Sequence, residues 1–248
     1  MSKHNIYYMA EKGLVEGMTI SESYKSWRQQ QRDGKHTDCN SCKFGKSARV
    51  SIDKVRSHAK AEKNGQVFCA DTCEIECRTP GGFKYLLCIG DDKSRFCWVY
   101  LLRTKTAQEM HEVLSGWWFT EVVPHANRTG IKCLEFFSDG GTEFVNSTVR
   151  AFFTKFGVKM TQSPPDTQAL NGFIERRWLD YCNMARTCMI AVYAPKNWWG
   201  GAVSHACWTK NRTVTHSHGQ RFIPYTQWHG RKPNMRMARP FGARAFVH

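Results

Sequence analysis

The sequence predicts an α/β fold in which helices flank a mixed β-sheet. Three strand-like segments come first, and helical and strand-like segments then alternate along the chain. Strands joined by turns pair antiparallel, whereas strands separated by crossover helices pair parallel, so the sheet is expected to be mixed. The chain has 248 residues, of which 41% are hydrophobic and 23% are charged. These values fit one large globular domain, or one domain with a small additional module.

Three strands are expected in the first part of this domain. Val67–Cys73 is a short, mostly apolar run with Asp71 embedded in it. Phe83–Gly90 and Arg95–Leu102 follow as two more strand candidates. The polar residues 91–94 between them are typical of a hairpin turn, so these two strands should be neighbours.

Helices and further strands alternate after residue 102. A helix is expected over Thr104–Val122, because its apolar residues recur at helical spacing. Another helix is expected over Asn146–Phe156, where Gly157 would end it. The remaining segments are strands over Ile131–Phe137 and Val158–Gln162, and helices over Ile6–Leu14, Phe173–Val192 and Trp198–Lys210.

The chain carries a large positive charge that is unevenly distributed. Its 36 Lys and Arg residues exceed its 21 Asp and Glu residues, and the net charge is +15. Residues 181–248 contain ten basic side chains and no acid. Such a surface attracts polyanions, of which nucleic acid is the commonest, although a basic domain without such a ligand is the alternative. No apolar run reaches the roughly 18 residues of a membrane span, so no membrane partner is expected.

Three carboxylates lie in or beside apolar segments, where burying a charged group costs free energy. Asp71 lies within an apolar strand, Asp139 directly follows another, and Glu175 lies near the start of a long helix. Each acid alone could be an ordinary turn or cap residue. If the three converge on one edge of the sheet, a hard divalent cation such as Mg²⁺ or Mn²⁺ would offset their repulsion. Two such ions would support phosphodiester chemistry.

The spacing of these acids and the sequence motifs around them resemble those of the integrase core of copia-type LTR retrotransposons, within the retroviral integrase superfamily. Between Asp139 and Glu175 lie 35 residues, and between Asp71 and Asp139 lie 67. The matching words are DDKSRFCWVY at 91–100, SDGGTEF at 138–144, NGFIER at 171–176, NR at 211–212, and the tail segments 224–233 and 241–248.

The resemblance implies a ribonuclease H-like core in which Asp71, Asp139 and Glu175 bind magnesium or manganese and are catalytic. The implied activity is that of a polynucleotidyl transferase, which trims the DNA ends of the element and joins them to double-stranded target DNA. It further implies a homo-oligomer that is part of a Pol polyprotein and acts in the nucleus, with a cytoplasmic particle stage. The candidate DNA contacts are Asn171, Arg176, Lys196, Lys210, Arg212, Arg231 and Lys232.

A small zinc-binding module is expected before the core. The eleven cysteines are an odd number, which argues against a disulfide framework, and only Cys39 and Cys42 have metal-ligand spacing. They resemble the second half of the two-His, two-Cys integrase motif, whose histidines would fall at or before Met1. We therefore expect an incomplete zinc site. The expected division is a truncated zinc module at 1–50, a linker at 51–65, the catalytic core at 66–230 and a basic C-terminal extension at 231–248.

Two departures from the family pattern leave other functions open. Gly140 stands where the family usually has Asn, and residues 168–170 differ from the usual loop before Glu175. The chain could therefore be a catalytically inactive DNA-binding remnant of an integrase. A hydrolytic nuclease of the ribonuclease H-like class is a third possibility, since it would use the same acids.

Overall fold

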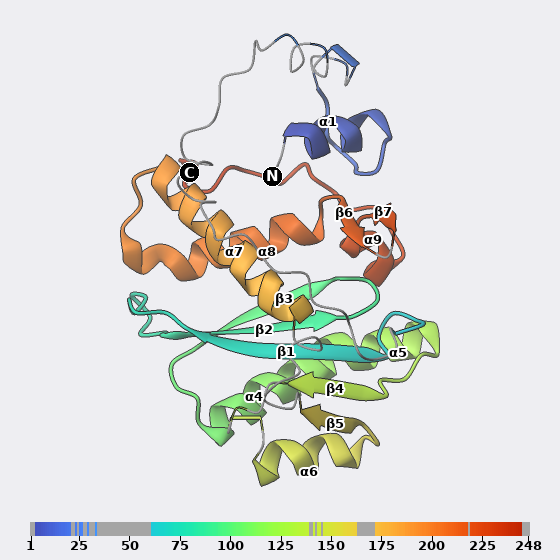
Figure 1. The fold of residues 1–248 in the computed structure, drawn as a ribbon, viewed down its shortest axis with the longest axis vertical. Helices are drawn as coiled ribbons and strands as arrows, with labels where there is room; N and C mark the ends of the chain where they lie inside the picture. The colour runs from blue at the N-terminus through green and yellow to red at the C-terminus, as the bar shows by residue number, and fades with distance from the viewer. Residues whose placement is uncertain are drawn as a thin grey trace, which may run out of the picture.

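The computed structural model describes most of the chain between residues 61 and 244, and a smaller part before it. The described residues are 3–20, 61–138, 146–162, 172–217 and 219–244, with the single positions 23, 25, 26, 29, 33, 141, 143 and 144. Figure 1 shows a central sheet with helices on both of its faces.

A mixed five-stranded sheet forms the centre of the molecule. Its order is β3-β2-β1-β4-β5, and the pairs β3-β2 and β2-β1 are antiparallel, whereas β1-β4 and β4-β5 are parallel. The predicted mixed α/β architecture and its five strands are therefore confirmed. The bounds are Val67–Glu74 for β1, Tyr85–Asp91 for β2, Cys97–Leu102 for β3, Glu135–Ser138 for β4 and Lys159–Gln162 for β5.

The central strand β1 is covered on both faces, and its side chains alternate between two cores. Phe68 and Ala70 lie in the core under α4 (Ala107–Trp117) and α6 (Ser147–Lys155). Cys69 lies in the opposite core, under α7 (Gly172–Ala191) and α8 (Trp199–Asn211). Figure 1 shows these two pairs of helices on opposite sides of the sheet.

The helix predicted over Thr104–Val122 begins later and continues further. Thr106 caps α4 by accepting a hydrogen bond from the backbone N–H of Glu109. A π-helical turn over Trp118–Val122 follows, and α5 (Val123–Thr129) continues from it. Proline lacks an N–H and clashes with the carbonyl four residues before it, so Pro124 predicts a helix end. The wider π-helical turn before Pro124 allows the chain to remain helical from α4 into α5.

The strand predicted over Ile131–Phe137 is shorter and shifted. Only Glu135–Ser138 joins the parallel ladder with β1. Leu134 and Glu135 both donate their backbone N–H groups to the carbonyl of Gln66, just before β1 begins. Residues 131–133, which include the apolar Ile131 and Cys133, therefore precede the strand, and hydrophobicity alone does not distinguish them from residues of the ladder.

The two ends of the described chain pack against each other. The helix α1 (Lys3–Glu11) contributes Met9 to a cluster with Val15, Ile223 and Met235. A parallel bridge joins Glu16 to Asn234. The other elements of this region are β6 (Thr215–Ser217), β7 (Gln220–Phe222), α9 (Pro224–His229) and, before α8, a 3₁₀ turn at Lys196–Trp198.

The acids of the β2–β3 turn are structural. Asp91 is fully buried and accepts hydrogen bonds from the backbone N–H groups of Gly65 and Ser94, each at 2.7 Å. Asp92 forms a buried ion pair with Arg95 at 3.1 Å. Burial raises the pKa of Asp91 to about 6, although its two backbone hydrogen bonds act in the opposite direction. Asp91 and Asp92 therefore stabilise the β2–β3 turn, and Asp91 also attaches Gly65, just before β1, to it.

The raised pKa of Asp91 predicts a specific pH dependence of stability. A carboxyl whose folded pKa exceeds its unfolded value contributes most below the unfolded value, near pH 4, and this contribution is lost as pH rises through about 6. Relative to Asp91→Asn, the wild-type chain should therefore lose about 2 kcal/mol of unfolding free energy between pH 4 and 7. Urea denaturation of both proteins across this range measures the difference. Parallel pH profiles would contradict the assignment.

Candidate functional site

Asp71 lies in the middle of the sheet, on the face of β1 that packs against α7. Its residue is only 7% exposed, although it carries a carboxylate. One carboxylate oxygen accepts a hydrogen bond from the backbone N–H of Thr72 at 2.8 Å. The other accepts one from the indole Nε1 of Trp178 at 2.9 Å. A buried carboxylate needs such donors, and a hydrogen bond to a charged group contributes about 1.5–3 kcal/mol.

The bond from Trp178 connects Asp71 to the helix that carries Glu175. The two helical residues are three positions apart in α7, so their side chains leave the same face of the helix, about 4.5 Å apart along its axis. Glu175 is half-buried, and its neighbour Ile174 is fully buried against the sheet. The structure therefore turns the helix face that carries Glu175 towards the face of β1 that carries Asp71.

Gly90 on β2 permits the close approach of this helix. A Cβ atom at Gly90 would lie 2.8 Å from the ring of Phe173 and 2.9 Å from the side chain of Ile174. Any larger residue at this position would require the side chains of Phe173 and Ile174 to shift. The absence of a side chain at Gly90 thus leaves room for the first turn of α7 beside the sheet.

The third predicted acid, Asp139, lies outside the described residues. Its predecessor Ser138 ends β4 and pairs with Ala70, the predecessor of Asp71, in the parallel ladder. Ser138 is 1% exposed, and among the described atoms its hydroxyl has no hydrogen-bond partner. The register of β1 and β4 therefore aligns the positions that directly precede the two acids.

The donor chemistry of Asp71 and Glu175 fits a hard divalent cation. Both side chains offer only carboxylate oxygens, which Mg²⁺ and Mn²⁺ prefer. Over the part of the chain that the structure describes, no three His, Cys, Asp or Glu side chains come together as a metal site. The predicted cluster needs Asp139 as its third member and stays a prediction. Sequence reasoning missed Trp178 as a partner of Asp71, although its spacing of three from Glu175 was a usable signal.

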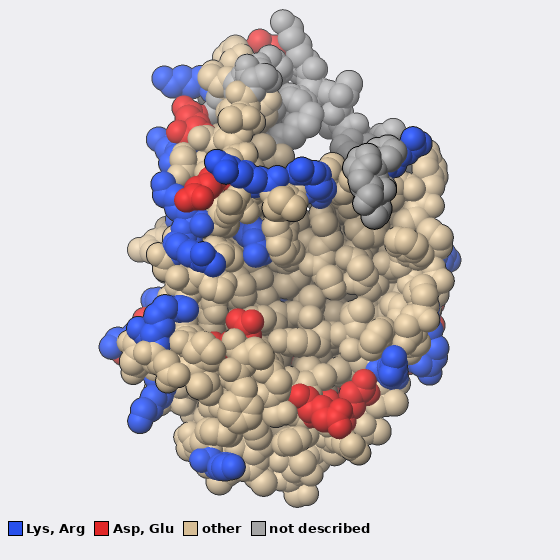
Figure 2. All heavy atoms as spheres, turned by 180° about the vertical axis from the view of Figure 1, so that it is seen from behind, with Lys and Arg blue, Asp and Glu red and all other residues tan. Residues whose placement is uncertain are grey.

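Four of the predicted DNA contacts are exposed basic side chains: Arg176, Lys196, Arg231 and Lys232. Arg176 follows Glu175 directly in α7. Figure 2 shows basic side chains gathered on the side of the molecule that carries β6, β7 and α9. These positions are available to a polyanion, and Asn171 lies outside the described residues.

Two other predicted contacts are already engaged within the fold. Lys210 pairs with Asp180 at 3.3 Å. The guanidinium of Arg212 stacks on Trp208 and Tyr225, with 4.3 and 4.7 Å to the ring centroids, and donates to the carbonyl of Trp208. Burial lowers the pKa of Arg212. Both side chains hold α8 in place, and their contact with DNA stays a prediction.

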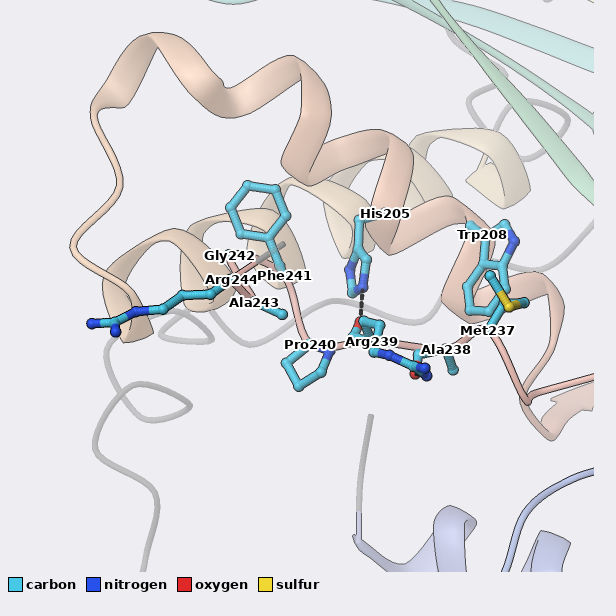
Figure 3. Close-up of a pocket in the computed structure, with 10 residues that line it drawn as sticks. All are labelled: His205, Trp208, Met237, Ala238, Arg239, Pro240, Phe241, Gly242, Ala243 and Arg244. Atoms are coloured by element: carbon cyan, nitrogen blue, oxygen red, sulfur yellow. Dashed lines mark hydrogen bonds between the residues drawn. The ribbon is translucent and has the colours of Figure 1, made fainter. Parts of the chain in front are cut away.

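A separate pocket lies where the C-terminal residues cross α8. Figure 3 shows His205 and Trp208 of α8 facing the segment that contains Arg239 and Phe241. A ring nitrogen of His205, Nε2, lies 3.0 Å from the carbonyl oxygen of Arg239. Phe241 also packs against the core under α7 and α8. The described part of the expected C-terminal extension is thus attached to the core through α8.

Two further expectations concern zinc and membranes. Cys39 and Cys42, the expected zinc ligands, lie outside the described residues, so the zinc half-site stays a prediction. Within the described ranges, no helix is both long and apolar enough to cross a bilayer.

Comparison with known proteins gives consistent matches. Residues 61–167 match the integrase core domain family. The whole chain is 30% identical over 252 residues to the retrovirus-related Pol polyprotein from transposon TNT 1-94 of Nicotiana tabacum. Of this chain, 84% is 26% identical to the corresponding polyprotein from transposon RE2 of Arabidopsis thaliana. The chain spans only 17% and 14% of the lengths of these relatives.

One solved structure that is similar to this chain is the HTLV-2 integrase catalytic core domain in complex with magnesium, in its trimeric form. The TM-score is 0.49 with 17% sequence identity, and the match covers 68% of this chain and all of that one.

Removing the indole donor of Trp178 should weaken metal binding. Trp178→Phe keeps an aromatic ring but leaves one oxygen of Asp71 without its hydrogen bond. Loss of a group that orients a metal ligand typically costs 10–100-fold in affinity, so we expect a decrease of about that size in Mn²⁺ affinity by titration calorimetry.

The matched control is Trp199→Phe, which removes an indole that donates to the carbonyl of Cys77 at 2.6 Å. This variant should bind Mn²⁺ like the wild type. Equal affinities for all three proteins would argue against a role of Trp178 at a metal site.

Proposed function

Because this chain carries the integrase core domain of retrotransposon Pol polyproteins, as its sequence motifs indicated, we propose that it is a metal-dependent polynucleotidyl transferase. It would trim the DNA ends of a copia-type element and join their 3′-hydroxyls to double-stranded target DNA. The single observation that carries this proposal is the buried Asp71 at the centre of the sheet, hydrogen-bonded to the helix that contains Glu175.

In the proposed mechanism, Asp71, Asp139 and Glu175 hold the cations. Bound Mg²⁺ or Mn²⁺ would activate a water or a 3′-hydroxyl and stabilise the leaving oxygen of the phosphodiester. The chain itself orients these ligands: Trp178 and the Thr72 N–H donate to the two oxygens of Asp71, and Gly90 leaves room for the side chains of Phe173 and Ile174 in α7. No nucleophilic side chain is required, because the attacking group comes from water or from DNA.

The DNA would be held by its phosphates. Arg176 stands beside Glu175 in sequence and is exposed, which suits a contact with the strand that reacts. Residues 181–248 contain no acidic side chain, so Arg231, Lys232 and the other basic residues of this segment supply positive charge that no acid within it offsets. Phosphate contacts of this kind position DNA with little dependence on its sequence.

The remaining parts of the proposal follow from the family alone. We propose a homo-oligomer that works in the nucleus after a cytoplasmic particle stage. We also propose that Cys39 and Cys42 form half of a zinc site.

Two other functions use the same features. A catalytically inactive remnant would bind DNA but not cut it, and a hydrolytic nuclease would nick DNA but not join ends. Strand transfer measured beside nicking, on the same end-labelled duplex, separates all three. Joined products support the transferase, nicks alone support the nuclease, and binding without either supports the remnant.

Neutralising a proposed metal ligand should abolish turnover. Asp71→Asn, Asp139→Asn and Glu175→Gln each remove a charge that two-metal catalysis needs, so Mg²⁺-dependent cleavage should fall by at least about 10³-fold. Asp180→Asn is the control, because this acid lies on the same helix and pairs with Lys210. Cleavage that persists in Glu175→Gln would exclude the proposed metal cluster.

Removing exposed charge should weaken DNA binding without altering sequence preference. Each phosphate contact contributes about 0.9 to the slope of log K against log salt, so the double variant Arg231→Gln, Lys232→Gln should flatten that slope by up to about 2. The control is Arg150→Gln, Lys155→Gln, which changes two exposed residues of α6. Fluorescence anisotropy with DNA duplexes of unrelated sequence measures the affinity and its salt dependence for both double variants. Identical slopes for the two double variants would place the DNA elsewhere.

A further inference from the structure

A second buried carboxylate, Glu143, lies behind the strand that carries Asp71. It is 7% exposed, and it follows Asp139 by four residues in the sequence. The hydroxyl of Thr72 donates a hydrogen bond to Oε1 of Glu143 at 2.5 Å. The ammonium of Lys105 lies 3.2 Å from the same oxygen. This trio of Glu143, Thr72 and Lys105 joins three separate segments of the chain.

The trio lies on the opposite face of β1 from the carboxylate of Asp71. Successive side chains of a strand point to opposite faces, so Thr72 points away from α7, into the side of the sheet covered by α4 and α6. Phe144, the next residue after Glu143, is fully buried in the core on that side. Glu143 therefore does not share a metal with Asp71, and any effect on the site passes through the backbone of β1 or of the β4–α6 connection.

Glu143 remains ionised despite its burial. Burial raises its pKa, but the hydrogen bond from Thr72 and the charge of Lys105 outweigh this, and the pKa lies below the usual value. A buried charge is costly unless it is paired and hydrogen-bonded. The trio satisfies both conditions, so removing one partner leaves the others with an uncompensated group.

Glu143 also fixes the chain between β4 and α6. Its backbone carbonyl accepts a hydrogen bond from the side chain of Asn146 at 2.7 Å, and Asn146 caps α6. The ring of Phe144 lies 6.4 Å, between centroids, from that of Phe136 in β4. By sequence, Asp139 belongs to this same connection, between Ser138 and Glu143.

We propose that Glu143 is a positioning residue for the metal site: it joins the β4–α6 connection, which contains Asp139, to the residue that follows Asp71 in β1. This inference rests on the proposed function. The trio holds two segments that must keep a fixed separation for their carboxylates to share a cation. Loss of the trio should therefore weaken cation binding although no metal ligand has changed.

A similar trio on the neighbouring strands β4 and β5 provides the control. Glu135, the first residue of β4, accepts a hydrogen bond from the hydroxyl of Thr161 at 2.5 Å and lies 3.5 Å from the ammonium of Lys159. It stands three residues before Ser138, about 10 Å along the strand from the end that leads to Asp139. Variants there remove comparable interactions without touching the segments beside Asp71.

The experiment measures Mn²⁺ affinity by titration calorimetry and the thermal midpoint by circular dichroism, with the full chain. Thr72→Val and Glu143→Gln should each lower Mn²⁺ affinity by about 10-fold or more, a size typical of groups that orient metal ligands. Thr72→Ser, which keeps the hydroxyl, should restore it to within about twofold of the wild type, since the bond to Glu143 is retained. Thr161→Val and Glu135→Gln should lower the thermal midpoint but leave the Mn²⁺ affinity unchanged.

The outcomes separate this inference from the proposed function. If the wild type binds no Mn²⁺, or if Asp71→Asn binds it equally well, the proposed function fails and this inference fails with it. If binding depends on Asp71 but Thr72→Val and Glu143→Gln leave it unchanged, only this inference is overturned. An equal loss of affinity in the Glu135 and Glu143 variants would also overturn it, because the effect would then be one of general stability. If Glu143→Gln does not fold, the comparison of Thr72→Val with Thr72→Ser decides.

Discussion

The burial of β1 on both faces is the constraint on which the rest of the structure depends. Residues 68–71 of this strand are buried between two helical layers, so the carboxylate of Asp71 needs partners from the protein. Asp71 receives the indole N–H of Trp178 on one face, and Thr72 donates to Glu143 on the other. The polar residues of one strand thus determine which parts of α7 and of the β4–α6 connection approach it.

The two faces of the sheet have different tasks. The face under α4 and α6 contains many large aromatic side chains. The ring of Trp117 lies 4.9 Å from that of Phe68 and 6.1 Å from that of Phe136, between centroids. The face under α7 and α8 combines small residues such as Cys69 and Ala185 with large ones such as Tyr181 and Trp199. Gly90 leaves room on this face for the side chains of Phe173 and Ile174 at the start of α7.

The basic C-terminal part of the chain belongs to the folded body as far as the structure describes it. Met235 is buried with Met9 and Val15, and Phe241 packs near α8. Some of its charges, such as Arg212, stabilise the fold by stacking on aromatic rings, while Arg231 and Lys232 remain exposed. Some basic side chains therefore stabilise the fold, whereas others are exposed and available to DNA. The side-chain contacts in the structure distinguish the two groups, and the composition does not.

The sequence by itself determined the class of fold, because hairpin turns and hydrophobic periodicity are local properties. The five strands and the helix around Glu175 lie close to where these patterns predicted them. The helix through Pro124, the shortened β4 and the short strands β6 and β7 depended on the tertiary structure, because pairing and packing override weak local preferences there. The spacing of Asp71, Asp139 and Glu175 predicted a shared site, and this site stays a prediction. The partners of Asp71 and Thr72 lie 107 and 71 residues away in the sequence, and contacts over such separations are decided only when the sheet and its helices come together.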